Sequence, residues 1–223
     1  MTRPARRTVP SRPRHRRAGT VLVCALTFVA SACAVSLDEV GAGPETVERA
    51  ADDAACEVTE SAVGADRTHL DPAGAPPPQE LYEQRPPAAG PHFAEWLDPG
   101  VYEGEIEERA AVHNLEHGAV VVWHDPALDD DQLTELRGWA ERRNAAGLLD
   151  TRTGAGIIVA PFADAPLTAP IAFRAWEVAG DCAAFSEVVA DEFVRTHFGP
   201  AGTAPERNLA PDPADVLGRT EAI

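Results

Sequence analysis

Hydrophobic positions along the chain form short apolar runs and amphipathic stretches that turn residues separate. Residues 119–123 form a prominent apolar run that is rich in β-branched residues, and Asp125-Pro126 follows it directly. This pattern predicts a buried strand. Residues 156–161 predict a second short strand, and residues 170–178 alternate between apolar and polar positions as a half-exposed strand does.

Three further stretches have helical patterns. Residues 130–146 begin at a run of aspartates and carry arginines near their end, which suits the helix dipole. Residues 182–197 repeat apolar side chains at helical spacing and stop before Gly199-Pro200. A shorter alanine-rich and acidic run, residues 47–56, predicts another helix.

These elements predict one α+β domain in which helices pack on a small mixed sheet. A chain of 223 residues with 44% hydrophobic residues can bury one substantial core, and nothing suggests two. The order of elements after Gly118 is similar to the second half of a thioredoxin-like fold. A ferredoxin-like arrangement fits almost as well, and both comparisons are analogies.

A long proline-rich loop precedes the first predicted strand. Residues 66–100 contain eight prolines, which excludes regular helix and central strand there. Tyr82, Phe93, Trp96 and Tyr102 lie in or beside this stretch. We expect these aromatic side chains to hold the loop against the domain, because a long structureless segment in a compact domain is usually functional or disordered.

The N-terminus has the form of an export signal. An arginine-rich start leads into an apolar stretch, residues 18–30, that has the length of a signal-peptide core rather than a membrane span. Ala30-Ser31-Ala32-Cys33 then resembles a lipobox, in which Cys33 would be lipidated. Ordinary signal-peptidase cleavage and an uncleaved anchor remain alternatives. All three place the domain outside the cytoplasm, anchored to the membrane or secreted.

The predicted organisation is therefore a signal peptide at 1–32, a tether and short helix at 33–65, the α+β domain at 66–206 and a partly ordered tail at 207–223.

After residue 17 the chain has 12 arginines and 36 acidic residues, a formal net charge of −24. Such a charge repels nucleic acid and anionic lipid headgroups. We expect no nucleic-acid partner, and the membrane is reached only through the N-terminus.

Only two of the four cysteines lie in the body of the chain, Cys56 and Cys182. In an oxidising compartment they most simply form one disulfide. A thiolate site for redox chemistry or metal lacks the adjacent Cys-x-x-Cys spacing.

The chemistry of the chain concentrates just before the first strand, in His113-Asn114-Leu115-Glu116-His117-Gly118. His113 and His117 are four residues apart, so one helical turn would bring both imidazoles to the same face. Glu116 lies between them, and Gly118 permits a sharp change of direction. The same residues fit the H-x-x-E-H pattern of inverted zinc peptidases, although that motif belongs inside a continuing helix.

Two ordered motifs carry a resemblance to a known family. The segment Pro86-Pro87-Ala88-Ala89-Gly90-Pro91-His92 precedes Trp96, Gly100 and Tyr102, and the His113 motif follows. This arrangement resembles a family of bacterial exported or membrane-anchored proteins catalogued as domain of unknown function 3105. The resemblance covers residues 66–206, and His69 also matches an upstream histidine. Ala88-Ala89 replace the small hydroxyl residues that are typical of the family. The family name implies no activity.

Four histidines therefore lie in the segments that carry the resemblance: His69, His92, His113 and His117. Neutral imidazoles gathered on one point suit zinc or copper(II). Methionine is absent after Met1 and the two body cysteines are expected to pair, which argues against a copper(I) site of thioether and thiolate. Glu116 would be a ligand, an orienter of an imidazole, or a base on metal-bound water. His124 and His197 have the setting of ordinary surface positions.

Three hypotheses about function follow. The first is an extracytoplasmic lipoprotein whose histidine cluster binds zinc or copper(II), and we do not expect it to be an enzyme. The second is a non-catalytic interaction module of the cell envelope, in which the histidines only hold the proline-rich loop by hydrogen bonds. The third, a zinc-dependent hydrolase, rests on the H-x-x-E-H pattern alone.

Overall fold

A computed structural model describes residues 41–60 and 65–218. They form one α+β unit around a five-stranded mixed sheet whose strand order is β1-β7-β6-β4-β5. The strands of this sheet are β1 (Cys56–Glu60), β4 (Val120–His124), β5 (Ile157–Pro161), β6 (Ile171–Ala175) and β7 (Val178–Cys182). The α+β class predicted from the sequence is confirmed. The helices are α1 (Pro44–Asp53), α2 (Pro78–Leu81), α3 (Glu108–Glu116), α4 (Asp130–Arg143), α5 (Glu187–His197) and α6 (Ala214–Leu217).

The connections of the sheet fit one of the two fold analogies better than the other. β4 and β5 are parallel neighbours joined through α4, while β6 pairs antiparallel with both β4 and β7. β7 follows β6 directly and α5 comes afterwards. The ferredoxin-like βαββαβ order needs a helix between the third and fourth strands. This βαβ-ββα order therefore agrees with the thioredoxin analogy.

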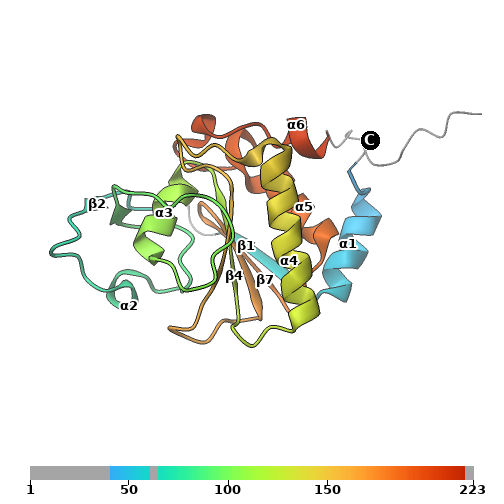
Figure 1. The fold of residues 1–223 in the computed structure, drawn as a ribbon, viewed down its shortest axis with the longest axis horizontal. Coiled ribbons are helices and arrows are strands. Elements are labelled where there is room, and N and C mark those ends of the chain that lie inside the picture. The colour runs from blue at the N-terminus through green and yellow to red at the C-terminus, as the bar shows by residue number, and fades with distance from the viewer. Residues whose placement is uncertain (1–40, 61–64, 219–223) are drawn as a thin grey trace, which may run out of the picture. The chain divides into compact units, whose positions relative to one another are not determined.

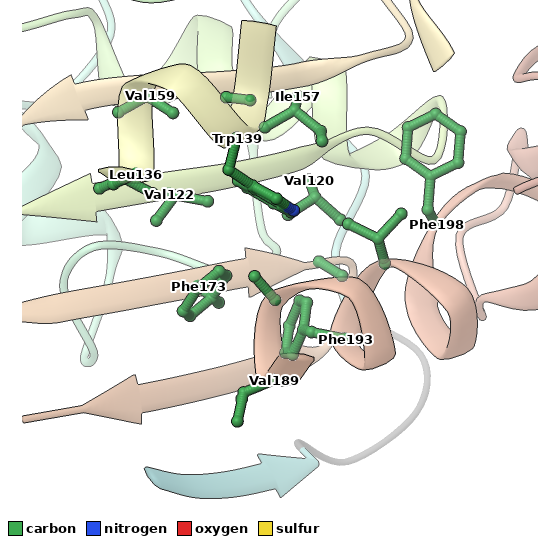
Figure 2. Packing of buried hydrophobic residues seen from close by; sticks show 14 of the residues in the cluster. Val120, Val122, Leu136, Trp139, Ile157, Val159, Phe173, Val189, Phe193 and Phe198 are labelled. Carbon is green, nitrogen blue, oxygen red and sulfur yellow. The ribbon is translucent and has the colours of Figure 1, made fainter. Parts of the chain in front are cut away.

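The sheet is covered on both faces, and the alternation along β4 separates the two cores. Val120 and Val122 point to the face that α4 and α5 cover, where Trp139 and Phe193 complete the packing (Figure 2). Val121 and Trp123 point to the other face, which α3 and the proline-rich loop cover. Figure 1 shows α1, α4 and α5 on one side of the sheet and α2, β2 and α3 on the other. Because both faces are buried, the strand reads as a continuous apolar run.

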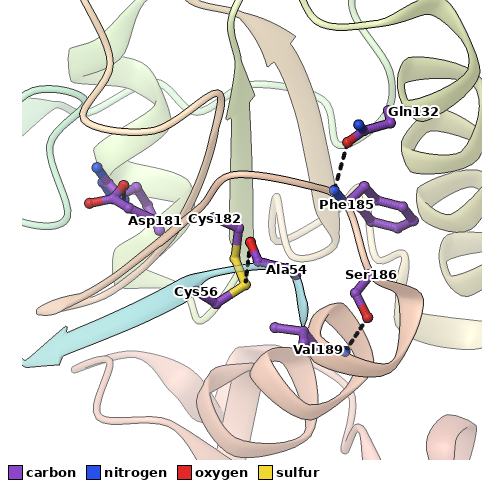
Figure 3. Close-up of a disulfide and its surroundings, with 9 residues drawn as sticks. Ala54, Cys56, Gln132, Asp181, Cys182, Phe185, Ser186 and Val189 are labelled. Atoms are coloured by element: carbon purple, nitrogen blue, oxygen red, sulfur yellow. Dashed lines mark hydrogen bonds and ion pairs between the residues drawn. A yellow bond between two sulfur atoms is a disulfide. The ribbon is translucent and has the colours of Figure 1, made fainter. Parts of the chain in front are cut away.

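The predicted disulfide is present and joins neighbouring strands. Cys56 opens β1 and is the cross-strand partner of Cys182 at the end of β7. The bond closes a loop of 126 residues, which in the chain-entropy model stabilises the fold by roughly 4–5 kcal/mol. Figure 3 shows the bond beside the start of α5, where the Ser186 hydroxyl accepts from the Val189 N–H and caps the helix. A disulfide suggests an oxidising, extracytoplasmic environment.

Several predicted element bounds are wrong. Residues 170–178 are not one half-exposed strand but the start of a buried hairpin, in which β6 turns at Trp176-Glu177 into β7. The helix expected from Cys182 starts only at Glu187, because Cys182 belongs to β7. The helix expected at 47–56 runs instead over Pro44–Asp53 and is followed by the edge strand β1.

The C-terminal segment packs as part of the domain. A 3₁₀ turn at Gly199–Ala201, a second at Arg207–Leu209 and α6 follow α5. Ala210 and Leu217 are buried in the same core as α5, whereas the sequence predicts a partly ordered tail there. None of the helices in the described ranges has the length and apolar character to cross a membrane.

Candidate metal centre

The proline-rich loop is fixed to the sheet and to α3 by buried polar contacts. Arg174 of β6 is 1% exposed, and its Nε donates to the Pro86 carbonyl at 2.8 Å while Nη1 lies 3.0 Å from the Asp181 carboxylate. The Tyr82 hydroxyl donates to the Pro91 carbonyl at 2.6 Å. These bonds hold the loop as it approaches His92. The expectation that the loop is packed down is therefore confirmed.

A short two-stranded sheet brings the first two histidines together. β2 (His69–Leu70) and β3 (His92–Phe93) run parallel, and His69 is the register partner of His92. Their imidazole centroids are 4.9 Å apart. His92 is fully buried, whereas His69 lies on the exposed β2. One side of the site is therefore rigid and the other is open to solvent.

The last turn of α3 supplies the other candidate ligands. His113 and Glu116 lie in this turn, and His117 is its C-cap. The helix stops there because Gly118 has φ +93 and its Cα approaches the backbone of Gly199 too closely for a side chain. The continuing helix that a zinc-peptidase motif needs is thus missing after His117, and β4 begins at Val120 instead.

Three imidazoles are oriented by the same kind of contact. Nδ1 of His92 lies 2.8 Å from the Gly90 carbonyl, and Nδ1 of His113 lies 2.7 Å from the Phe93 carbonyl. Nδ1 of His117 contacts the Thr153 carbonyl. Because a carbonyl only accepts, each Nδ1 must carry the proton, and each Nε2 of a neutral ring presents a lone pair. Histidines that ligate metals are commonly oriented in this way.

Three of the imidazoles offer ligand atoms that lie close together. The ligand atoms of His69, His92 and His113 all lie within 4.8 Å of one another. Nitrogen ligands of a tetrahedral zinc ion are about 3.3 Å apart at bond lengths of about 2.0–2.1 Å. Metal binding would therefore draw the three imidazoles closer together. The donor set and its spacing therefore fit zinc or copper(II).

Glu116 faces the same space. Its Oε2 lies 3.0 Å from Nε2 of His92 and 3.8 Å from Nε2 of His69. Its Oε1 lies 3.8 Å from Nη1 of Arg67, whose side chain is half exposed. The Glu116 side chain itself is 5% exposed. A buried carboxylate beside two of the imidazoles can offset part of the charge of a divalent ion bound there, although Glu116 does not belong to the group that converges within 4.8 Å.

His117 lies beside the triad rather than within it. Its Nε2 is 2.9 Å from Nε2 of His113, but the group that converges within 4.8 Å contains only His69, His92 and His113. On its other side His117 Nε2 lies 3.4 Å from Oε2 of Glu206. Convergence of four imidazoles on one point, as the sequence suggested, is therefore seen for three of them.

Burial favours the neutral form of His113. Desolvation is the chief cause that lowers its pKa to about 4. The neighbouring His117, His92 and His69 lower the pKa further, whereas the hydrogen bond to the Phe93 carbonyl raises it. A neutral imidazole keeps its Nε2 lone pair available to a metal ion at neutral pH.

Other residues support the site in ways that the sequence did not predict. Asn114 is fully buried, and its amide bonds to both the N–H and the carbonyl of Leu97 and to the Gly154 carbonyl. These bonds tie the loop that carries Trp96 to the loop after α4. The Trp96 ring stands edge-on to His113 and His117, and Trp176 packs edge-on to His92. Their roles depend on the tertiary structure alone.

The remaining sequence predictions have mixed outcomes. His124 is 2% exposed at the end of β4, so its interpretation as a surface residue is wrong. Burial lowers its pKa. His197 is half-buried beside Phe193. Cys33 and the predicted signal peptide lie outside the described residues.

Comparison with known proteins gives a family without an activity. The family model described as a protein of unknown function, DUF3105, matches residues 79–212. This range contains His92, the His113 motif and Glu206, and it starts after His69. A search of curated proteins and a search of solved structures each returned no match. The matched range is more than half of the chain, so the protein belongs to the DUF3105 family.

Proposed function

We propose that this protein is an exported, membrane-anchored domain that binds a divalent transition metal, zinc or copper(II), at His69, His92 and His113, with Glu116 as the fourth ligand. The observation that carries the proposal is the common orientation of the rings. Nδ1 of His92 and of His113 is bonded to a backbone carbonyl, which leaves the Nε2 atom of each ring for a metal ion. The ligand atoms of both residues lie within 4.8 Å of each other and of that of His69, and Oε2 of Glu116 lies 3.0 Å from Nε2 of His92.

The same contacts bear on the alternative of an interaction module with structural histidines. Hydrogen bonds through Nδ1 do anchor the proline-rich loop, as that alternative requires. They leave the grouping of the Nε2 atoms beside a buried carboxylate unexplained. Metal binding accounts for both sets of contacts, since the bonds through Nδ1 then orient the ligands.

The location outside the cytoplasm is part of the proposal. The disulfide between Cys56 and Cys182 supports an oxidising compartment. The N-terminal sequence supports export, with lipidation at Cys33 as the anchor. Labelling of cells with a radioactive fatty acid, comparing wild type with Cys33→Ala, tests the anchor. The label is expected on the wild type only, and label on neither protein would contradict lipidation.

A competition titration tests the metal site. Purified protein is stripped with a chelator and titrated with zinc and, separately, with copper(II) against a chromophoric competitor. Wild type is expected to bind one ion, and His92→Gln and His113→Gln are each expected to weaken binding by at least about tenfold. His197→Gln, a histidine of α5 outside the cluster, is the control and should bind as wild type. Absence of binding at micromolar metal would contradict the proposal.

A further inference from the structure

His113 and His117 contact each other through the ring atoms that do not bond the backbone. Their Nε2 atoms are 2.9 Å apart, and both Nδ1 atoms donate to carbonyls, those of Phe93 and Thr153. His117 therefore offers a further nitrogen ligand beside the triad of His69, His92 and His113, which does not include it.

A carboxylate completes this second position. Oε2 of Glu206 lies 3.4 Å from Nε2 of His117, and the Glu206 side chain is 48% exposed, whereas that of His117 is 5% exposed. The backbone holds Glu206 there, because its N–H donates to the Glu116 carbonyl at 3.0 Å. The neighbouring Arg207 turns its guanidinium to the Ala204 carbonyl. Glu206 therefore places a solvent-facing carboxylate oxygen next to His117, and His117 in turn contacts His113.

The charges at the two solvent-facing ends of the cluster differ. At the His69 side, the half-exposed Arg67 lies 3.8 Å from Glu116, and the exposed carboxylate of Asp66 interacts with His92, so charges of both signs flank this end. At the His117 side, the Glu206 carboxylate lies 3.4 Å from Nε2 of His117. A negative charge at the entrance of a site raises the association rate of a cation. A divalent cation is therefore expected to enter and leave past Glu206.

We infer that Glu206, His117 and His113 form an outer metal position through which an ion enters and leaves the inner site, the proposed site at His69, His92, His113 and Glu116. His113 is a ligand of both positions. This inference rests on the proposed function of the inner site. In loading, an ion would first bind Glu206 and His117 and then also His113. His113 stays bound while the bonds to Glu206 and His117 break and those to His69 and His92 form. The arrangement suits a protein that passes zinc or copper(II) on, rather than one that stores it.

Rates and equilibrium constants separate this inference from a simple ligand role. In stopped-flow experiments, the metal-free full-length protein is mixed with zinc, and the zinc-loaded protein is mixed with excess chromophoric chelator. A Glu206→Gln variant is expected to slow both loading and release by about tenfold or more, since steering by charge changes rates by this order, with an equilibrium constant within about threefold of wild type. Glu57→Gln, the same substitution at an exposed position of β1, should change neither.

A double variant adds a second readout. If both residues act on one route, Glu206→Gln combined with His117→Gln should slow release no more than the stronger single variant. Unchanged rates of zinc loading and release in Glu206→Gln would overturn the inference of an outer metal position. So would weaker binding caused by faster release alone, because Glu206 would then be a ligand of the inner site. Failure of wild type to hold zinc would instead overturn the proposed function, before any variant is compared.

Discussion

Nε2 of His92 lies 3.0 Å from Oε2 of Glu116, in the buried space between β3 and α3. Nδ1 of His92 donates to the Gly90 carbonyl, so Nε2 of the neutral ring has only a lone pair to offer. The carboxylate also offers only lone pairs. A metal ion bound at the proposed site would take the place of this direct contact.

A Glu116→Gln variant follows from this relationship. The amide of glutamine can donate to Nε2 of His92, so the metal-free variant should be as stable as wild type to within about 1 kcal/mol. Metal affinity should fall by about 10–100-fold, because the negative fourth ligand is lost. Urea unfolding and competition titration measure the two effects. Glu83→Gln, at an exposed position, is the control. If Glu116→Gln kept full metal affinity, Glu116 would not be a ligand of the site.

Asn114 is expected to be a stability determinant rather than a ligand. Its amide makes three hydrogen bonds, to Leu97 twice and to Gly154, and it has no exposed surface. Asn114→Ala leaves these partners unsatisfied, so the free energy of unfolding should drop by about 2–4 kcal/mol. Asn208→Ala, at an exposed site, should stay within about 0.5 kcal/mol. Equal stability of both variants would show that this network contributes little.

Removal of the disulfide should lower stability without changing the metal site. The variant in which both Cys56 and Cys182 are alanine should lose about 2–5 kcal/mol in urea unfolding. The bond lies between β1 and β7, and the histidines lie on β2, β3 and α3, so zinc affinity at 25 °C should be unchanged. Dithiothreitol should lower the melting temperature of wild type but not of the variant. A wild-type protein insensitive to reduction would contradict this account.

Protonation of His124 should contribute to acid destabilisation of the metal-free protein. Burial lowers its pKa in the folded state, with Arg137 acting in the same direction and the Asp125 carbonyl and Glu103 opposing it. The unfolded chain then binds more protons than the native state below its ordinary pKa of 6.5, so stability is full above about pH 6.5 and declines as the pH falls.

The variant His124→Leu removes this contribution. The loss of stability between pH 7.5 and 5.5 should be smaller than in wild type by up to about 1 kcal/mol, as urea unfolding at each pH would measure. The substitution also removes Nε2, which has no hydrogen-bond partner among the described residues. Thr134→Ala, at an exposed position of α4, should keep the wild-type pH dependence. Identical slopes in wild type and His124→Leu would contradict the assignment.

Local patterns were sufficient to predict the central part of the fold. β4, β5 and α4 lie close to their predicted ranges, because each has a clear pattern of apolar residues and strong boundary residues. One of these is Asp129, whose side chain caps α4. Cys56 and Cys182 are the only cysteines in the body of the chain, so their pairing needed no structure. The sequence predicted that His69, His92, His113 and His117 converge, and three of these four, His69, His92 and His113, do so.

The errors arise where tertiary contacts override local signals. The β6–β7 hairpin turns at Glu177, which has φ +62 without being glycine or asparagine, so no turn residue separates the strands. The C-terminal segment is acidic and proline-rich in composition, yet Gly199 and Glu206 bond to the backbone of the His113 motif. Glu206 therefore lies beside His117 through contacts that no sequence pattern indicates.

X-ray absorption spectroscopy of the zinc-loaded protein at the zinc edge tests the central claim most directly. The account predicts three imidazole nitrogens and one carboxylate oxygen at about 2.0–2.1 Å, and one imidazole fewer in the His92→Gln variant. A first shell of water and carboxylate oxygens without imidazole scattering, or an identical spectrum in the variant, would contradict it.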